Sequence, residues 1–439
     1  MRFRISPLAV WLASMAAVVL AVSLTAASGA IALAVKGRAN ATPAIAADGP
    51  FVIVAWGGAQ ASGATDVFAS VSRDGGRVFG APIRVNNVDG DARVNGEQPP
   101  QIALVRRAGR EPAIVIVWTT KGAKGTALRQ SRSDDGGRSF TPASLVPGTD
   151  APGNRGWEAI AVEPGGRVDA IWLDHRELAA SSTLAMSHHE HTSAGKPDGV
   201  AMAQQSKLFF GSLDGTLTPR AVTGGVCYCC KTALAVGSGG AVYAAWRHVY
   251  PGNLRDMAFT MSRDGGRTFA LPVRVSEDKW ALQGCPDDGP TMVVDAQNRI
   301  HVVWPTLVTD GTAEGVENIA LFYAMSTDGK PFTARERIPT EGVPHHPRIV
   351  VAADGALTVA WDESANGLRR VAIGHGTADD SGRLRFRREL LTGGPGVYPV
   401  LAVAGDGVVA AWTSSASAEL SIQVARIAMN VHAGTKRNR

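Results

Sequence analysis

Three of the four cysteines in this chain lie within four residues. Cys227, Cys229 and Cys230 belong to the segment GGVCYCCKTA, and the fourth cysteine is Cys285. Thiolates are soft ligands for copper or zinc, they pair into disulfides in oxidising compartments, and they can act as nucleophiles. Side chains alternate along an extended segment, so a single partner at Cys285 cannot satisfy all three sulfurs. We therefore expect either a disulfide from the cluster to Cys285 or a metal site of copper or zinc, with thiol redox chemistry as the third alternative.

Histidines supply the other candidate metal ligands. His345 and His346 are held between prolines in VPHHPR, His175 lies in DHRE, and the segment MSHHEH contributes His188, His189 and His191. Imidazole suits both copper and zinc, and a His-rich loop is otherwise a solvated surface feature. The candidate ligand or metal-binding set is Cys227, Cys229, Cys230, Cys285, His345, His346 and His175.

The elements that must position these residues recur along the chain. Seven short runs rich in β-branched residues and alanine each end in tryptophan, which indicates buried strands. They end at Trp56, Trp118, Trp172, Trp246, Trp304, Trp361 and Trp412. A similar apolar run precedes most of them, for example PQIALV and PRIVVA.

A glycine-rich turn follows the third strand of several repeats. The three full copies are SRDGGRVF, SDDGGRSF and SRDGGRTF, with degenerate versions at Ser212 and Ser326. Asp and Ser side chains bond nearby N–H groups, glycines accept positive φ, and the aromatic residue packs beneath the turn. A carboxylate held by its own loop has no proton to exchange, so these positions are expected to be structural. They are Ser72, Asp74, Gly76, Phe79, Ser133, Asp135, Gly137, Phe140, Ser262, Asp264, Gly266 and Phe269.

These turns resemble the Asp-box, or BNR repeat, of the sialidase superfamily. The resemblance implies an all-β fold, a propeller of four-stranded antiparallel blades. Seven tryptophan-ended strands predict seven blades, with six as the alternative, and IALAVKG ahead of the first repeat is expected to supply the missing last strand.

The alternating direction of the strands predicts which face of the propeller carries the candidate functional side chains. The glycine-rich turns join third to fourth strands, so the starts of first strands and the ends of second strands lie on the opposite face. The first two blades offer little there beyond TTKG and GEQPP. The residues expected to converge are Arg155, Glu158, Asp174, His175, Arg176, Glu177, Cys227 to Lys231, Arg247, His248, Cys285, Asp287, Asp288, His345, His346, Arg348, Asp362, Glu363 and Tyr398.

Sialidases grip a carboxylate with three arginines and use a Tyr–Glu pair and an Asp, so the resemblance implies an acidic-sugar hydrolase. The first blade should begin with Arg-Ile-Pro, but it reads ATPAIAA, and RIP at 337–339 falls in a fourth strand. The reassigned catalytic candidates are Arg155, Asp174, Arg176, Arg247 and Tyr398, with Arg348 as a further grip and Glu158 or Glu363 as the base. The alternative is that these arginines pair with neighbouring acids in a structural role.

Composition limits the remaining choices. The chain has 439 residues, is 45% hydrophobic and carries a formal charge of +5 without a clustered basic stripe, which argues against nucleic acid as a partner. Arg2 and Arg4 precede an apolar run ending in small residues, so residues 1–40 are expected to form a signal peptide or an uncleaved membrane anchor helix. Residues 41–439 then form an exported, periplasmic or extracellular propeller. Its expected partner is a metal ion or a small anionic or glycan-like ligand, and an envelope protein is a further alternative.

Overall fold

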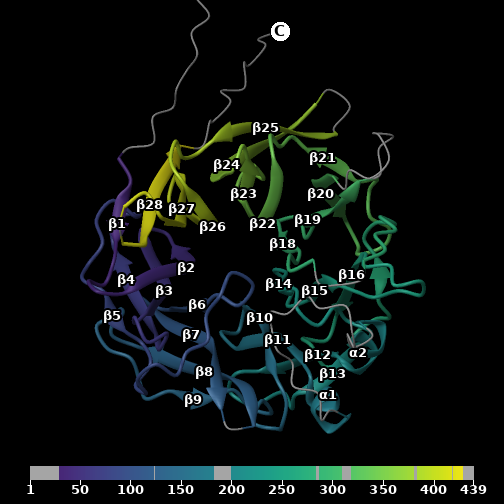
Figure 1. Ribbon diagram of the computed structural model, residues 1–439, viewed down its shortest axis with the longest axis horizontal. Helices are drawn as coiled ribbons and strands as arrows, with labels where there is room; N and C mark the ends of the chain where they lie inside the picture. The colour runs from purple at the N-terminus through teal and green to yellow at the C-terminus, as the bar shows by residue number, and fades with distance from the viewer. Residues whose placement is uncertain are drawn as a thin grey trace, which may run out of the picture.

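Seven four-stranded antiparallel sheets surround a common axis (Figure 1). The computed structural model describes residues 29–122, 124–181, 199–282, 286–308, 318–379, 383–417 and 419–428. In six sheets the first strand in the chain lies innermost, and in the sheet that joins the two ends of the chain the innermost strand is β26 (Gly396–Ala404). The innermost strands of neighbouring sheets contact one another around the ring. The expected seven-bladed propeller is confirmed.

Each blade runs from its innermost strand outward. Blade one contains β2 (Ala39–Asp48), β3 (Phe51–Ala59), β4 (Thr65–Ser72) and β5 (Ile83–Arg84), and blade two contains β6 (Gln101–Arg107), β7 (Arg110–Gly122), β8 (Gly125–Ser133) and β9 (Ser144–Leu145). Blade three contains β10 (Arg155–Val162), β11 (Val168–Asp174), β12 (Lys207–Ser212) and β13 (Arg220–Gly224), and blade four contains β14 (Ala233–Val236), β15 (Val242–Arg247), β16 (Met257–Ser262) and β17 (Val273–Arg274).

Blade five contains β18 (Thr291–Val294), β19 (Ile300–Val308), β20 (Asn318–Ser326) and β21 (Glu336–Ile338), and blade six contains β22 (Val343–Val351), β23 (Leu357–Ala365), β24 (Leu368–Ala378) and β25 (Leu384–Leu390). Blade seven contains β26 (Gly396–Ala404), β27 (Gly407–Ser414), β28 (Ser421–Ala428) and β1 (Ile31–Leu33). Two short helices, α1 (Arg176–Ser181) and α2 (Gly199–Gln205), lie between β11 and β12.

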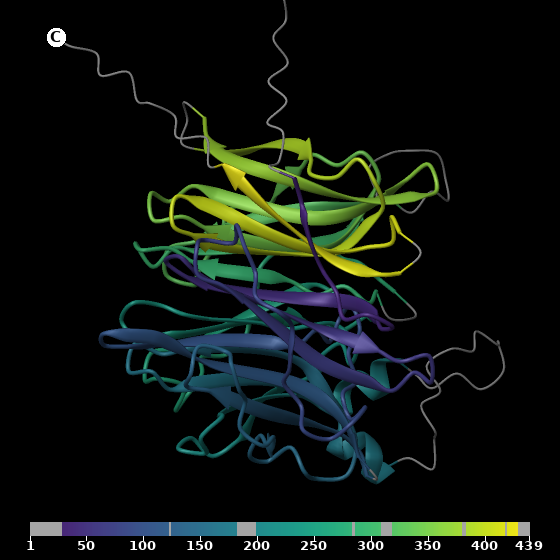
Figure 2. The same ribbon diagram turned by 90° about the vertical axis from the view of Figure 1, so that its left-hand side faces the viewer.

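The ring closes by pairing the two ends of the chain. Strand β1 pairs antiparallel with β28, with Ile31 opposite Val424 and Leu33 opposite Ile422. Figure 2 shows the purple β1 beside the yellow β28. The expectation that residues ahead of the first repeat complete the last blade is confirmed, so the propeller includes residues before position 41. Closure leaves the last sheet with four strands like the others.

The seven tryptophans of the second strands fill the core between blades, and each strand continues for one to four residues beyond its tryptophan. All seven are at most 5% exposed. A buried indole N–H needs an acceptor, and several tryptophans find one two residues further along the same strand. The N–H of Trp172 donates to Asp174 at 3.2 Å, and that of Trp361 donates to Glu363 at 2.9 Å. Some polar residues at the strand ends therefore complete the core.

The glycine-rich turns lie between third and fourth strands, as expected. In the turn at Ser262, the Ser262 hydroxyl donates to Asp264 at 2.6 Å and accepts the N–H of Gly266 at 2.8 Å. The same two contacts occur in the turns that begin at Ser72 and Ser133. Hydrogen bonds from within the turn lower the pKa of Asp264, which keeps its carboxylate ionised and engaged.

Several sequence predictions fall outside the described residues. They are residues 1–28 of the expected signal or anchor segment at 1–40, the histidines at 188, 189 and 191, and Cys285. Residues 31–33 and 39–40 of that segment are strand and not helix. Among the residues that are described, no helix has both the length and the apolar character needed to cross a bilayer.

Gly266→Ala tests the packing beneath these turns. Gly266 has φ of +85°, and an added Cβ would approach the Phe210 ring to 2.3 Å. We expect the substitution to lower the free energy of unfolding by about 1–3 kcal/mol. Gly239→Ala is the matched control, since its Cβ would meet nothing within 4 Å, and it should stay within about 0.5 kcal/mol of the parent. Equal stability of the two variants in chemical denaturation would contradict this account.

Candidate functional site

The first strands reach the axis through a repeated irregularity. Strands β10, β22 and β26 each carry a register shift near their start, and Trp157, His346 and Tyr398 adopt positive φ there. The three positions are equivalent in their blades. Two residues after each of them, the first strand pairs with the residue that precedes the core tryptophan of the second strand, as Arg348 pairs with Ala360 before Trp361. A bulge bends the strand and redirects side chains. His346 and Tyr398 therefore face each other across adjacent blades, with ring centroids 4.5 Å apart.

Lys231 is at the equivalent position in blade four and is buried at the centre of an ionic network. Its Nζ lies 3.3 Å from Glu97 Oε1 and 3.6 Å from Asp288 Oδ1, and its backbone N–H donates to Glu97 Oε2 at 2.8 Å. Burial raises the pKa of Glu97, although the charge of Lys231 opposes that shift. The network joins the linker between blades one and two to the segments that lead into the first strands of blades four and five.

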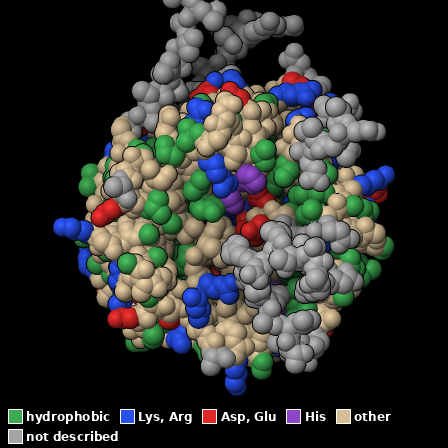
Figure 3. Space-filling model, in the orientation of Figure 1, with side chains coloured by type: hydrophobic (Ala, Val, Ile, Leu, Met, Phe, Trp, Pro, Cys, Tyr) green, Lys and Arg blue, Asp and Glu red, His purple; other side chains and the backbone are tan. Residues whose placement is uncertain are grey.

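Two histidine–aspartate pairs extend this network into blade six, and the backbone N–H of Tyr398 in blade seven donates to Asp362. His345 Nδ1 lies 3.2 Å from Asp288 Oδ2, and His346 Nδ1 lies 2.8 Å from Asp362 Oδ1. Burial favours the neutral form of Asp288, but the hydrogen bond with His345 and the charges of Lys231 and His346 outweigh it and lower the pKa of Asp288 to about 2. Figure 3 shows histidine, acidic and basic side chains gathered at the centre of this face.

A small polar cavity of about 120 Å³ lies beside the network. Arg348 on β22 lines it together with Lys231 and Glu158. Within the described chain, the Arg348 guanidinium makes no hydrogen bond or ion pair, and burial lowers the pKa of Arg348. It is therefore a cation directed at the cavity whose donors are available to a ligand.

Glu158 on β10 is the second group in the cavity with unused bonding capacity. It is 3% exposed, its Oε2 accepts a hydrogen bond from Thr119 at 3.2 Å, and its Oε1 has no hydrogen-bond partner among the described residues. Burial raises the pKa of Glu158 to about 7 because the anion loses its hydration. Its charge thus changes near neutral pH.

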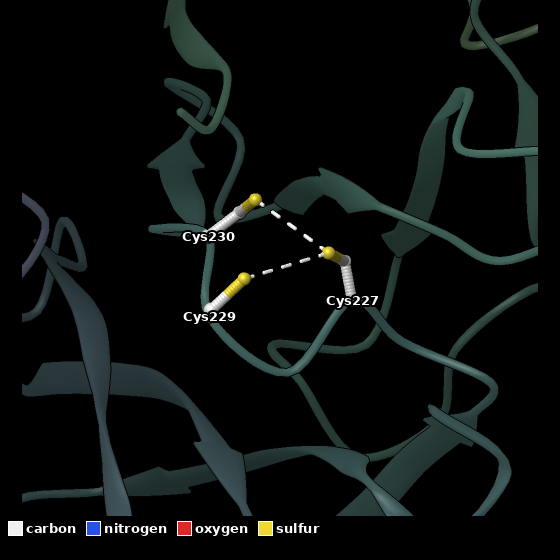
Figure 4. Close-up of side chains that lie close together, drawn as sticks. All are labelled: Cys227, Cys229 and Cys230. Carbon is white, nitrogen blue, oxygen red and sulfur yellow. Dashed lines mark hydrogen bonds between the residues drawn. The ribbon is translucent and has the colours of Figure 1, made fainter. Parts of the chain in front are cut away.

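The three clustered cysteines lie just outside this cavity, in the loop that leads to β14, and their sulfurs converge (Figure 4). Cys227 Sγ is 3.8 Å from Cys229 Sγ and 3.6 Å from Cys230 Sγ, and the three sulfurs lie within 4.8 Å of one another. Cys227 and Cys230 carry free thiols, whereas Cys229 is disulfide-bonded. Two of the three converging sulfurs are therefore thiols that a metal ion could use.

The surroundings of Cys227 favour its thiolate. The thiol of Cys230 donates to Cys227, and the hydrogen bond together with the nearby Arg255 and Arg247 lowers the pKa of Cys227 to about 6 despite its burial. Burial and the neighbouring thiolate raise the pKa of Cys230 instead. The pair therefore shares one proton near neutral pH, with Cys230 as the donor.

The structure separates the expected ligand set into two groups. Among the described residues, the group of ligand atoms close enough for a metal contains only the three cysteines, whereas His345 and His346 bond carboxylates. His175 stacks against Trp157 at 5.2 Å, in blade three. The expected disulfide to Cys285 stays a prediction, because Cys285 lies outside the described residues.

The five residues proposed for catalysis do not meet at one place. Arg155, Asp174 and Arg176 form a buried cluster at the end of β11, where both guanidiniums pair with the Asp174 carboxylate. Arg247 donates to the carbonyl oxygens of Asp288, Arg255 and Pro305. Of the five, Tyr398 alone lines the space around the axis. These contacts favour the structural alternative for the other four.

Sequence reasoning missed three contributors. Glu97 lies in GEQPP, a segment that was expected to contribute little. Its neighbour Gly96 lets this segment pack against the Tyr398 ring, because a Cβ at position 96 would lie 2.1 Å from that ring. Arg255 lies in an irregular segment with no strand signal and donates to Cys227 Sγ at 3.1 Å. The C-x-x-C spacing of Cys227 and Cys230 was legible in the sequence and would have indicated their proximity.

No family model and no curated protein matches this chain. Solved structures resemble it in shape. An ulvan lyase of polysaccharide lyase family PL25 has a TM-score of 0.54 at 11% identity, covering 89% of this chain and 95% of that one. A puromycin-hydrolysing peptidase of Mycobacterium tuberculosis has a TM-score of 0.51 at 16% identity, covering 90% of this chain and 52% of its own.

A Hadza microbial sialidase has a TM-score of 0.45 at 14% identity, covering 83% of this chain and 73% of that one. Identities this low show the propeller fold alone.

Asp288→Asn tests the central network. The lowered pKa of Asp288 means that its charge stabilises the fold above the ordinary carboxyl pKa near 3.8, and that this stabilisation is lost as pH falls through about 2. We expect the variant to lose about 2 kcal/mol of unfolding free energy at pH 7, with the difference from the parent shrinking between pH 4 and 2. The exposed Asp406→Asn is the control. A difference that does not change with pH would contradict the assignment.

Proposed function

We propose that this protein is an exported β-propeller whose central cavity binds the anionic end of a small ligand, with a carboxylate-bearing sugar as the chemical class. The observation that supports this most strongly is Arg348, a cation directed at the cavity without a hydrogen bond or ion pair in the described chain. A guanidinium held on a strand presents its donors in a fixed fork that matches a carboxylate.

The size and lining of the cavity support an end group over a whole chain of sugars. Its volume of about 120 Å³ is below the roughly 300–1,000 Å³ of pockets that enclose drug-sized ligands. Arg348 and Lys231 provide positive charge, and Glu158 Oε1 provides a hydrogen-bonding group. A carboxylate bound to Arg348, with a hydroxyl near Glu158, would use the two groups whose bonding capacity is free, and the charge of Lys231 would add to the positive potential.

Arg348→Gln tests this proposal by calorimetric titration with glucuronate and N-acetylneuraminate at pH 6. We expect the parent to bind at least one of these acids and the variant to bind it about 30–100-fold more weakly, since truncating one partner of a buried charge pair costs about 2–5 kcal/mol. Arg106→Gln on an exposed side chain is the matched control and should bind like the parent. Binding of neutral glucose with equal affinity, or unchanged affinity in Arg348→Gln, would refute the proposal.

The pH dependence of this binding has a defined sign. Below the raised pKa of Glu158, near 7, the carboxyl is neutral and does not repel an anionic ligand. As pH rises through about 7, Glu158 ionises, and we expect the affinity to fall about tenfold between pH 6 and 8. Glu158→Gln should remove this dependence while keeping the affinity found at pH 6. A parent affinity that rises with pH would show that Glu158 has another role.

A glycoside hydrolase of exo-α-sialidase type is the alternative, and Tyr398 is the observation in its favour. The Tyr398 ring packs against His346 where the first strands converge, as a nucleophile at the site would. Against it, Glu363 accepts the Trp361 N–H and pairs with Arg388. Three of the four arginines of the proposed grip, Arg155, Arg176 and Arg247, are also engaged elsewhere. Cleavage of a fluorogenic sialoside by the parent, lost in Tyr398→Phe, would establish the hydrolase.

A further inference from the structure

Residues 227–230 place two free thiols beside a sulfur that already belongs to a disulfide. Cys227 and Cys230 are free, whereas Cys229 is disulfide-bonded, and all three are between 1% and 4% exposed. The partner of Cys229 lies outside the described residues, and Cys285 is the only other cysteine in the chain. A thiolate and a disulfide are the two reactants of thiol–disulfide exchange. This loop therefore contains both of them.

The sulfurs of the loop are close enough to react with one another. Cys227 Sγ lies 3.8 Å from Cys229 Sγ and 3.6 Å from Cys230 Sγ (Figure 4). Cys227 thus contacts both one sulfur of the disulfide and a second thiol. The C-x-x-C spacing of Cys227 and Cys230 is the spacing of redox-active dithiols. Cys227 is therefore the sulfur through which a disulfide can pass from Cys229 to Cys230.

Two buried arginines stabilise a thiolate at Cys227. Arg255 donates to Cys227 Sγ at 3.1 Å. Its other acceptors among the described residues are a side-chain oxygen of Asn253 and the Leu282 carbonyl, which are neutral. Arg247 donates only to carbonyl oxygens in the described chain, and its own carbonyl accepts the Cys227 N–H at 2.9 Å. Buried cations need counterions, and the Cys227 thiolate supplies one.

Cys227 and Cys230 differ in how readily they lose a proton, which fixes the order of attack. The hydrogen bond from the Cys230 thiol, with the charges of Arg255 and Arg247, lowers the pKa of Cys227 to about 6 despite its burial. Burial and the neighbouring thiolate raise the pKa of Cys230. The thiolate is the nucleophile in exchange, so Cys227 attacks first while Cys230 holds its proton.

We propose that residues 227–230 form an intramolecular thiol–disulfide exchange site, which moves one disulfide between Cys229 and the Cys227–Cys230 pair. The Cys227 thiolate attacks Cys229 Sγ, and the bond from Cys229 to its partner breaks with the electron pair on the partner sulfur. Cys230 then passes its proton to that sulfur and attacks Cys227, which releases Cys229 as a thiolate.

The exchange is balanced within the chain. Cys227 and Cys230 together lose two electrons, and Cys229 and its partner gain two. A single proton and a single thiolate charge are present before and after, so no outside oxidant or reductant takes part. The product replaces the covalent link from Cys229 to its partner by a bridge inside the loop. The loop is thus a switch that opens and closes one cross-link.

Peptide mapping distinguishes the two positions of the disulfide. Trypsin releases the three clustered cysteines in one peptide, 221–231, and Cys285 in another, 280–299. A disulfide from Cys229 to Cys285 joins the two peptides, whereas a disulfide between Cys227 and Cys230 stays inside the first. Acid quenching followed by thiol alkylation in denaturant preserves the distribution for mass spectrometry, because protonated thiols do not exchange.

Relaxation of this distribution tests the proposal on the full chain. The protein is reduced, oxidised at pH 5 with one equivalent of diamide, and brought to pH 8. We expect the disulfide to appear first inside peptide 221–231 and then to relax to the distribution of the never-reduced protein, while two of the four cysteines remain thiols throughout. Transfer should be about tenfold faster at pH 8 than at pH 5, since the Cys227 thiolate forms as pH rises through its pKa of about 6.

Arg255→Met separates the exchange site from general damage, because it leaves every sulfur in place. We expect transfer at pH 6 to be about tenfold slower, since the pKa of Cys227 rises when this charge is removed. The exposed Arg73→Met is the matched control and should exchange like the parent. Cys227→Ser should abolish transfer.

Near-ultraviolet circular dichroism establishes which proteins are folded. If reduction unfolds the parent, the internal disulfide must instead be found in the never-reduced protein at pH 8. A disulfide that stays where it first forms, or one found between the two peptides at every time, would overturn the proposal. None of these outcomes depends on glucuronate binding to Arg348.

Discussion

The buried ammonium group of Lys231 is the interaction on which the centre of the propeller depends. An unpaired charge at that depth would be prohibitively costly, so Glu97 and Asp288 must lie beside it. Asp288 in turn bonds His345 and the N–H of His346, and Asp362 bonds His346 and the N–H of Tyr398. Residues from blades six and seven and from three segments that connect blades are thereby held in one charge-compensated network around the axis.

This requirement also decides which groups remain for a ligand. Most ionisable side chains near the ends of the second strands already form ion pairs and hydrogen bonds. Asp174 pairs with two arginines and accepts the Trp172 N–H. Glu363 pairs with Arg388 and accepts the Trp361 N–H. Arg348 and the Oε1 of Glu158 are the groups at the cavity with bonding capacity left. A binding site in this fold is therefore defined by what the structural network leaves unsatisfied.

The two candidate sites adjoin in sequence but differ in chemistry. Cys230 and Lys231 are consecutive, yet one side chain joins a sulfur cluster and the other a carboxylate network. Successive side chains of an extended segment point in opposite directions, which accounts for this division.

The sequence alone determined the architecture, because the seven tryptophan-ended strands and the glycine-rich turns are local patterns repeated along the chain. Alternating strand direction also predicted that His346, Tyr398 and Lys231 gather around the axis, and the structure brings them into one network. Only the tertiary structure decided which of these side chains meet. In the structure, Glu97 pairs with Lys231 near the axis, and Arg155 and Arg176 both pair with Asp174. Arg255 donates a hydrogen bond to Cys227. Pairing of buried charges depends on distances between blades, and those distances are not encoded in any local pattern of residues.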